Sequence, residues 1–168
     1  DELERWIVAF RGPLIGLLAS WGLDWAAAEE VAMDVFAEAW LGRARFAGDP
    51  ADLEQSGAWL NGIARNLWRA WHRRTQRPDG GTLPEQLAAR PPEEDERRAV
   101  LVAAVAELDA EHQTVLRMHY LEETSAREVA ALLGTTPKAV EMRLYQARRA
   151  LRERVERLQR RAAAEVRR

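Results

Sequence analysis

The sequence predicts an all-α protein with two small helical domains joined by a flexible linker. Apolar residues recur at three- and four-residue spacing, and no stretch alternates as a strand does. All seven tryptophans lie in the first 71 residues, which predicts two separate cores. Residues 77–94 are rich in prolines and glycines, which break helices. We therefore predict domains at 1–76 and 95–168, with the linker at 77–94.

Composition excludes several functional classes. The chain has 168 residues, of which 47% are hydrophobic, and no apolar run reaches the roughly eighteen residues of a membrane span. Its first residues are acidic rather than basic, so we expect a cytoplasmic protein without membrane insertion. The absence of cysteine excludes disulfides, thiolate zinc sites and thiol nucleophiles. The three histidines lack metal-ligand spacing and no nucleophile motif is present, so we expect no metal, no cofactor and no enzymatic activity.

Charge is segregated along the chain, although the net charge is only −2. Residues 1–40 hold eight acids and two arginines, residues 57–78 hold five arginines and no acid, and residues 134–168 hold eleven bases and four acids. Two basic segments in an acidic background suit a protein that contacts a polyanion at two places. The alternative interpretation is ordinary solvated helix faces.

The first informative helix is predicted at 26–42. Glu30, Asp34 and Glu38 form an acidic stripe at four-residue steps. The apolar face is wide, with two rows made of Val31, Val35 and Ala39 and of Ala32, Phe36 and Trp40. Either part of this face meets a partner, or the helix is buried on two sides and its acids are merely solvated. Periodicity alone does not separate the two.

The segment 57–76 divides into two faces when it is wound as a helix. The predicted buried stripe is Leu60, Ile63, Ala64, Leu67 and Trp71. The opposite face combines cations, amides and an aromatic ring without a carboxylate: Asn61, Arg65, Trp68, Arg69, His72, Arg73 and Gln76. Arginines neutralise phosphates, and an exposed tryptophan stacks an unpaired base for roughly 1–3 kcal/mol. A basic amphipathic helix that lies on a membrane, or is simply solvated, remains the alternative.

A helix-turn-helix is predicted near the C-terminal end. Ser125 and Glu128 form a capping-box pattern before one helix, which Gly134 ends in the left-handed conformation. Pro137 then suits the first position of a second helix. Ala130, Gly134 and Val140 have the spacing of the helix crossing, the turn and the core residue of this motif.

The second helix of this motif carries the predicted duplex-reading residues. Its inward stripe is Val140, Leu144, Ala147, Leu151 and Val155, continuing to Leu158 and Ala162. Its outward side chains are Lys138, Glu141, Met142, Tyr145, Arg149 and Arg152, with Arg143 and Arg148 at the flanks. Arginine bonds guanine bidentately in a major groove. The alternative is an ordinary helix-packing seam or a coiled coil.

The order of these elements resembles one bacterial family. Residues 28–40 (AEEVAMDVFAEAW) and 58–74 (AWLNGIARNLWRAWHRR) resemble region 2 of extracytoplasmic-function (ECF) sigma factors, which belong to the sigma-70 family of RNA polymerase sigma subunits. Residues 96–153 resemble their region 4. The resemblance implies a transcription initiation factor that recruits core polymerase to specific promoters and recognises and melts promoter DNA. It implies no catalytic residues, because the polymerase does the chemistry.

The resemblance also assigns roles to positions. The residues that match the family's core-polymerase site, which binds the clamp helices of the largest subunit, are Glu30, Asp34, Phe36, Glu38 and Trp40. The residues implied to bind the minus-ten element are Arg65, Asn66, Arg69, Arg73 and the loop 46–57, with Asn61 and Trp68 on the same predicted face. The residues implied to bind the minus-thirty-five element are Lys138, Glu141, Met142, Arg143, Tyr145 and Arg148. Further implied partners are the flap of the second-largest subunit and an anti-sigma factor.

The chain departs from the family's usual pattern at several positions. Glu141 and Met142 stand where a basic residue and a serine are common, and Met33 replaces a usual glutamine. The loop 46–57 carries three acids, Asp49, Asp52 and Glu54. The alternative function is a stand-alone helix-turn-helix regulator that binds operator DNA through its C-terminal domain, which leaves the arginine face of 57–76 unexplained.

Overall fold

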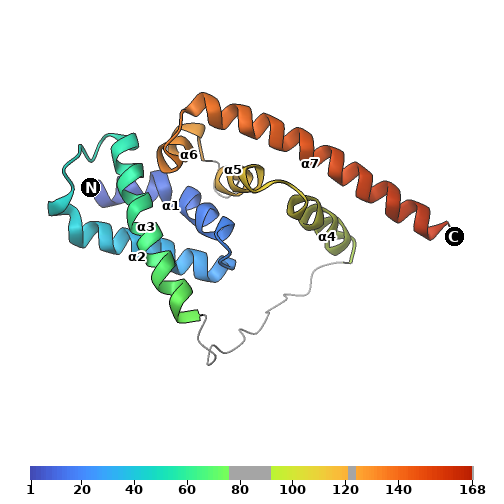
Figure 1. Cartoon of the computed structure of the whole chain (residues 1–168), viewed down its shortest axis with the longest axis horizontal. Helices are drawn as coiled ribbons and strands as arrows, with labels where there is room; N and C mark the ends of the chain where they lie inside the picture. Colours follow the sequence, from blue (N-terminus) through green and yellow to red (C-terminus); the bar gives the residue numbers. More distant parts are fainter. Residues whose placement is uncertain (76–91, 121–123, 168) are drawn as a thin grey trace.

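A computed structural model describes residues 1–75, 92–120 and 124–167, with side chains in the second range from Glu96 onward. These ranges contain α-helices, a short 3-10 helix and no strand, which confirms the predicted fold class. In chain order the elements are α1 (Glu2–Ser20), α2 (Trp25–Gly42), η1 (Arg43–Arg45), α3 (Leu53–Thr75), α4 (Pro92–Ala106), α5 (Ala110–Tyr120), α6 (Ala126–Leu133) and α7 (Pro137–Val166) (Figure 1). Residues 76–91, which include Gln76 of the predicted basic face and most of the predicted linker 77–94, lie outside the described residues. Helix α4 begins at Pro92, before the linker's predicted end.

Helices α1, α2 and α3 form the N-terminal half. Aspartates cap the first two helices: the Leu3 N–H donates to Asp1 Oδ1 at 3.2 Å, and the Ala27 N–H donates to Asp24 Oδ1 at 2.8 Å. The wide apolar face of α2 is buried inside the molecule, because α1 and α3 both pack against this helix. Its buried residues are Val31, Ala32, Val35, Phe36 and Ala39. The structure thus favours two-sided burial over an apolar surface left for a partner.

Helices α4 to α7 form the C-terminal half, in which α4, α5 and α6 all pack against α7. Gly134 ends α6 in the left-handed conformation (φ 65°), and Pro137 opens α7, as predicted. The Thr136 hydroxyl accepts from the Ala139 N–H at 3.2 Å. Ser125 does precede α6, but its side chain makes no capping hydrogen bond, so the predicted capping box is wrong.

The two halves pack directly against each other. Helix α1 lies against α5 and α6, and α3 lies against α6 (Figure 1). A single cluster of buried residues runs from Trp6 to Ala147 through both halves. The prediction of two separate cores is therefore wrong, because the distribution of tryptophan reports composition and not which apolar faces meet.

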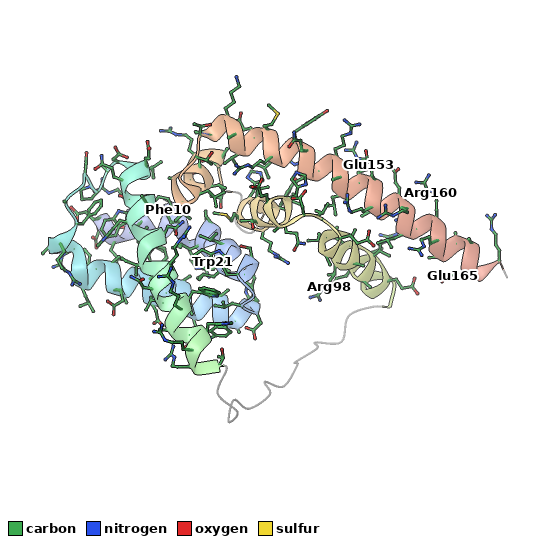
Figure 2. The ribbon with its side chains drawn as sticks, viewed as in Figure 1. Phe10, Trp21, Arg98, Glu153, Arg160 and Glu165 are labelled. Carbon is green, nitrogen blue, oxygen red and sulfur yellow. The ribbon has the colours of Figure 1, made fainter. Side chains whose placement is uncertain are left out.

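Helix α7 projects beyond the rest of the molecule. Its buried residues, Val140, Leu144 and Ala147, lie in its first half. Leu151, Val155 and Leu158 are half-buried, and Ala162 is exposed. Arg160 and Glu165 lie on the projecting end (Figure 2). The inward stripe was thus predicted correctly where other helices cover it.

Candidate nucleic-acid interface

The loop before α3 is held by a small set of local contacts. The Gln55 backbone N–H donates to Asp52 Oδ1 at 3.1 Å, and the Gln55 amide donates to Asp52 Oδ2 at 2.8 Å. Hydrogen bonds from the backbone and then the side chain of Gln55 lower the pKa of the half-buried Asp52 carboxyl. The Gln55 amide oxygen also accepts from the Asp49 N–H at 3.2 Å. The loop therefore has a defined conformation at the start of α3.

Aromatic rings anchor the same loop to the core. The indole N–H of Trp6, which is 2% exposed, donates to Ser56 Oγ at 3.2 Å and to the Pro50 carbonyl at 3.3 Å. Phe46 stacks on Trp59 with ring centroids 4.7 Å apart. These contacts fix both ends of the loop against the N-terminal core.

The buried and exposed faces of α3 follow the predicted division. Leu60 and Ala64 are fully buried, and Ile63, Leu67 and Trp71 are half-buried. On the other side Arg65, Asn66, Arg69, His72 and Arg73 are exposed. A row of guanidinium groups with an amide thus stands exposed on one side of the helix, which suits contact with phosphates.

Two predicted minus-ten residues are already occupied by contacts within the chain. The Asn61 amide donates to the Leu132 carbonyl of α6, and its oxygen accepts from Arg65 Nε at 2.9 Å. Trp68 is half-buried, its indole N–H donates to the Trp21 carbonyl at 3.3 Å, and one face stacks on His72 at 5.3 Å. In this arrangement neither side chain is free to meet a base, which their helical spacing could not reveal.

The recognition helix α7 presents most of its predicted residues to solvent. Lys138, Glu141, Met142 and Tyr145 are exposed. Arg143 is half-buried, with its Nε 3.8 Å from Glu111 Oε2. Arg148 is exposed, and its Nε donates to the Tyr120 hydroxyl at 2.6 Å.

The acidic stripe of α2 is exposed, but its predicted aromatic members are not. Glu30, Asp34 and Glu38 face solvent, whereas Phe36 is 1% exposed. The half-buried Trp40 lies under the Arg43 guanidinium, 4.0 Å from the ring centroid. Direct contact of Phe36 with a partner therefore conflicts with its burial. The candidate residues for binding core polymerase are then the three exposed acids.

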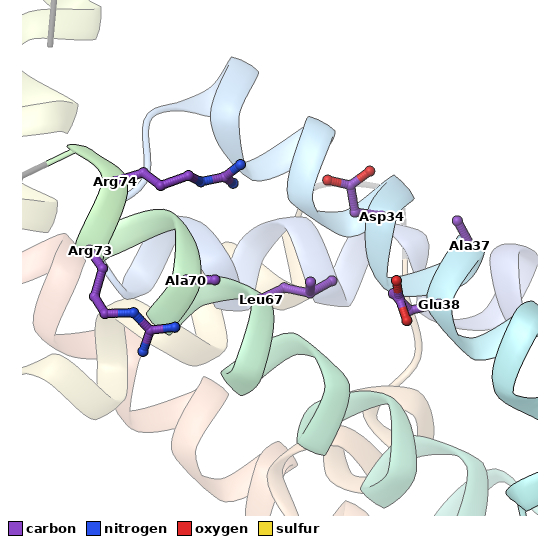
Figure 3. A pocket seen from close by; sticks show the side chains of 7 residues that line it. All are labelled: Asp34, Ala37, Glu38, Leu67, Ala70, Arg73 and Arg74. Atoms are coloured by element: carbon purple, nitrogen blue, oxygen red, sulfur yellow. The ribbon is translucent and has the colours of Figure 1, made fainter.

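A groove of about 630 Å³ runs between α2 and α3 (Figure 3). Asp34 and Glu38 line it from α2, and Arg73 and Arg74 line it from α3, with apolar Leu67 and Ala70 at its base. The predicted core-binding acids and a predicted DNA-binding arginine thus share one groove. Sequence reasoning missed Arg74, because only the packing of the two helices brings it there.

Neither a metal centre nor a membrane span is found in the part of the chain that the structure describes. No group of three or more histidine, aspartate or glutamate side chains there could hold a metal ion. The described helices include none with the length and apolar character needed to cross a bilayer.

Comparisons with known proteins agree with this geometry. A sequence model of the family "Sigma-70, region 4" matches residues 98–151. The probable RNA polymerase sigma factor RfaY of Xanthomonas campestris pv. campestris is 35% identical over 141 residues, covering 77% of this chain and only 34% of RfaY. The ECF RNA polymerase sigma factor SigL of Mycobacterium tuberculosis is 32% identical over 136 residues, covering 77% of this chain and 75% of SigL.

A solved structure of CnrH in complex with the cytosolic domain of CnrY has a similar fold. Its TM-score is 0.54 at 24% identity, and the alignment covers 92% of this chain and 87% of the other. At that identity the likeness concerns the fold alone.

Proposed function

Since this chain belongs to the ECF family of RNA polymerase sigma factors, we propose that it recruits core polymerase to specific promoters and initiates transcription by recognising and melting promoter DNA. One structural observation supports the proposal independently of family membership. A single chain presents an exposed arginine face on α3 and an exposed recognition helix on α7. A stand-alone regulator needs only the second of these.

The minus-ten role rests on the exposed residues of α3. Arg69 and Arg73 lie four residues apart on one side of the helix, where guanidinium groups can follow a phosphate backbone. Asn66 adds an exposed amide that can bond a base edge. Unstacking a base costs a few kcal/mol, which these contacts must offset during melting. Asn61 and Trp68 can take part only after their present contacts are released.

The minus-thirty-five role rests on the first turns of α7. Lys138 and Tyr145 are exposed there and can contact phosphates or base edges. Glu141 can accept from the amino group of a cytosine, and Met142 offers an apolar contact to a thymine methyl. Arg143 and Arg148 extend the set at the flanks of the helix.

The polymerase-binding role rests on the acidic stripe of α2. Three exposed carboxylates on a helix whose buried apolar residues are committed to the core suit a basic partner surface. The chain itself supplies binding and no covalent chemistry, and it acts in the cytoplasm, where polymerase and DNA are found. An anti-sigma factor is the further partner that the family implies, and the similar structure of CnrH is likewise a complex with a second protein, CnrY.

The decisive experiment is transcription in vitro with purified core polymerase and genomic fragments. We expect the chain to direct core to a small set of start sites, with unpaired bases near each start and strong sensitivity to salt. A chain that binds one duplex tightly without core, and leaves core activity unchanged, would instead be a stand-alone regulator.

A further inference from the structure

The guanidinium group of Arg148 on the recognition helix α7 is held by a residue of another helix. Arg148 Nε donates to the hydroxyl of Tyr120, the last residue of α5, at 2.6 Å. The Arg148 Cζ atom lies 5.4 Å from the centroid of the Tyr120 ring, and that ring meets His119 edge-on at 5.2 Å. Because 28 residues separate Tyr120 from Arg148, the packing of α5 against α7 makes this contact, and the local sequence does not.

The bond to Tyr120 leaves the outer edge of the guanidinium group for another ligand. A guanidinium group has five N–H donors, and this bond uses the one on Nε. The four donors on Nη1 and Nη2 form the fork that grips two oxygens of a phosphate bidentately. Arg148 is exposed and Tyr120 is 59% exposed, so a DNA backbone can reach both side chains.

The position of Arg148 on α7 suits a phosphate contact. Arg148 follows Glu141 by seven residues, or about two turns, so both lie on the same side of the helix. In a helix-turn-helix the first residues of the recognition helix contact base edges. Arg148 lies about 15 Å beyond Lys138 along the axis, where a straight helix leaves a groove that curves away from it. The nearest DNA groups there are backbone phosphates, which fix the register of the protein.

The neutral charge of the tyrosine hydroxyl favours this contact. The other flanking arginine, Arg143, has its Nε 3.8 Å from a carboxylate oxygen of Glu111, near the opposite end of α5. A carboxylate offsets the positive charge of its partner and repels an approaching phosphate, whereas a tyrosine hydroxyl accepts the hydrogen bond without adding a charge. Tyr120 therefore orients Arg148 and leaves its full positive charge for DNA.

We propose that Tyr120 is a positioning residue, which holds the Arg148 guanidinium group in place for a bidentate contact with one backbone phosphate of the minus-thirty-five duplex. A free arginine side chain loses rotamer freedom when it binds, at a cost of about twofold to tenfold in affinity. The hydrogen bond to Tyr120 lowers that cost, because it orders the side chain before DNA arrives. The inference rests on the proposed function, because it places α7 on promoter DNA.

The test is a double-mutant cycle in the full-length chain bound to core polymerase. Tyr120→Phe removes the hydroxyl but keeps the ring and the net charge, and Arg148→Ala removes the guanidinium group. Thr114→Val is the matched control, because it removes an α5 hydroxyl that donates to the Ala110 carbonyl of the same helix at 2.8 Å. Affinity is measured at several salt concentrations from the anisotropy of two labelled duplexes. One carries a promoter found by transcription in vitro, and the other carries the same promoter with its minus-thirty-five element scrambled.

We expect Tyr120→Phe to weaken binding about twofold to tenfold on both duplexes, because a phosphate contact does not depend on base sequence. Arg148→Ala should weaken both further and reduce the slope of log affinity against log salt by about 0.9, the value for one phosphate contact on duplex DNA. In the Arg148→Ala background, Tyr120→Phe should have no further effect, which a purely structural role of the tyrosine does not produce. Thermal unfolding of Tyr120→Phe and DNA binding by Thr114→Val should both match wild type.

An equal loss from Tyr120→Phe with and without Arg148 would refute the positioning role, because the tyrosine would then act by itself. Unchanged or tighter binding by Tyr120→Phe, or a similar loss in Thr114→Val, would also contradict it. A loss confined to the intact promoter would exclude a phosphate as the ligand.

Two further outcomes separate this inference from the proposed function. If the wild-type chain directs core to start sites while the cycle shows no coupling, only the positioning role is wrong. If the wild-type chain does not associate with core, the proposed function is wrong. The same cycle, measured with the chain alone on a mixed-sequence duplex, then decides the role of Tyr120.

Discussion

Replacing Arg69 and Arg73 with alanine should impair promoter melting and leave the affinity for core polymerase intact. Both side chains are exposed on one side of α3, and neither belongs to the acidic stripe of α2 that is proposed to bind core, although Arg73 lines the same groove as Asp34 and Glu38. The double substitution removes two positive charges that are proposed to contact the unpaired strand. Its effect should therefore depend strongly on salt concentration.

The magnitude follows from counterion release. Each phosphate contact on a single strand contributes about 0.7 to the slope of log affinity against log salt, so two lost contacts reduce that slope by about 1.4. Between about 50 and about 200 mM salt, a fourfold change, the difference in affinity between wild type and variant should shrink about sevenfold. The assay is anisotropy of a labelled, partly unpaired promoter fragment bound by the chain together with core.

A charge-matched control is available on the projecting end of α7. Arg160 and Arg161 are exposed and outside both predicted DNA-binding sets, so replacing them removes the same charge without removing these contacts. If the two double variants lose affinity and slope equally, the effect is one of net charge and the assignment of α3 is wrong. Equal loss of core binding and melting in the α3 variant would also refute the division of roles.

Four further substitutions separate structural from binding roles. Asp34→Ala should weaken core binding at low salt with little change in thermal unfolding, and equal core affinity of this variant and wild type would contradict the docking assignment. Phe36→Ala, at a position that is 1% exposed, should lower the free energy of unfolding by about 3–5 kcal/mol. Gly134→Ala, at φ 65°, should lower the free energy of unfolding by about 1–2 kcal/mol in urea titrations, and an unchanged midpoint would contradict the strain argument. Gln55→Ala should raise the pKa of Asp52 part of the way toward its ordinary value in an NMR titration, since the backbone donor remains. Because the folded-state pKa is lowered, the stabilisation from this carboxylate is present at neutral pH and lost as the pH falls through that value.

Local rules accounted for much of the fold. Periodicity alone placed Leu60 and Ala64 on the buried side of α3, and the conformational demands of Gly134 and Pro137 located the turn between α6 and α7. These features depend on neighbours within a few residues, which the sequence displays directly. Ser125 shows the limit even here, since a residue suited to capping does precede α6 but makes no capping hydrogen bond.

Features that depend on distant partners could not be predicted in the same way. Trp68 looks exposed from its spacing, yet it contacts Trp21, 47 residues earlier in the chain. The wide face of α2 was equally consistent with a partner and with burial until α1 and α3 were seen to cover it. Likewise, Gly57 has no local signal that separates it from Gly62, although only Gly57 lies against the backbone of Ala131 in α6.

The length of α7 has a mechanical consequence. Its 30 residues, at 1.5 Å per residue, make a rod about 45 Å long. The side chains predicted to read bases are near one end, and just past the middle of the helix Arg154 Nε donates to the Glu107 carbonyl at 3.1 Å, next to α4. A tilt of about ten degrees at the first end displaces the far end by about 8 Å. A change in the tilt of the helix axis at the base-reading end therefore displaces the opposite end by several ångströms.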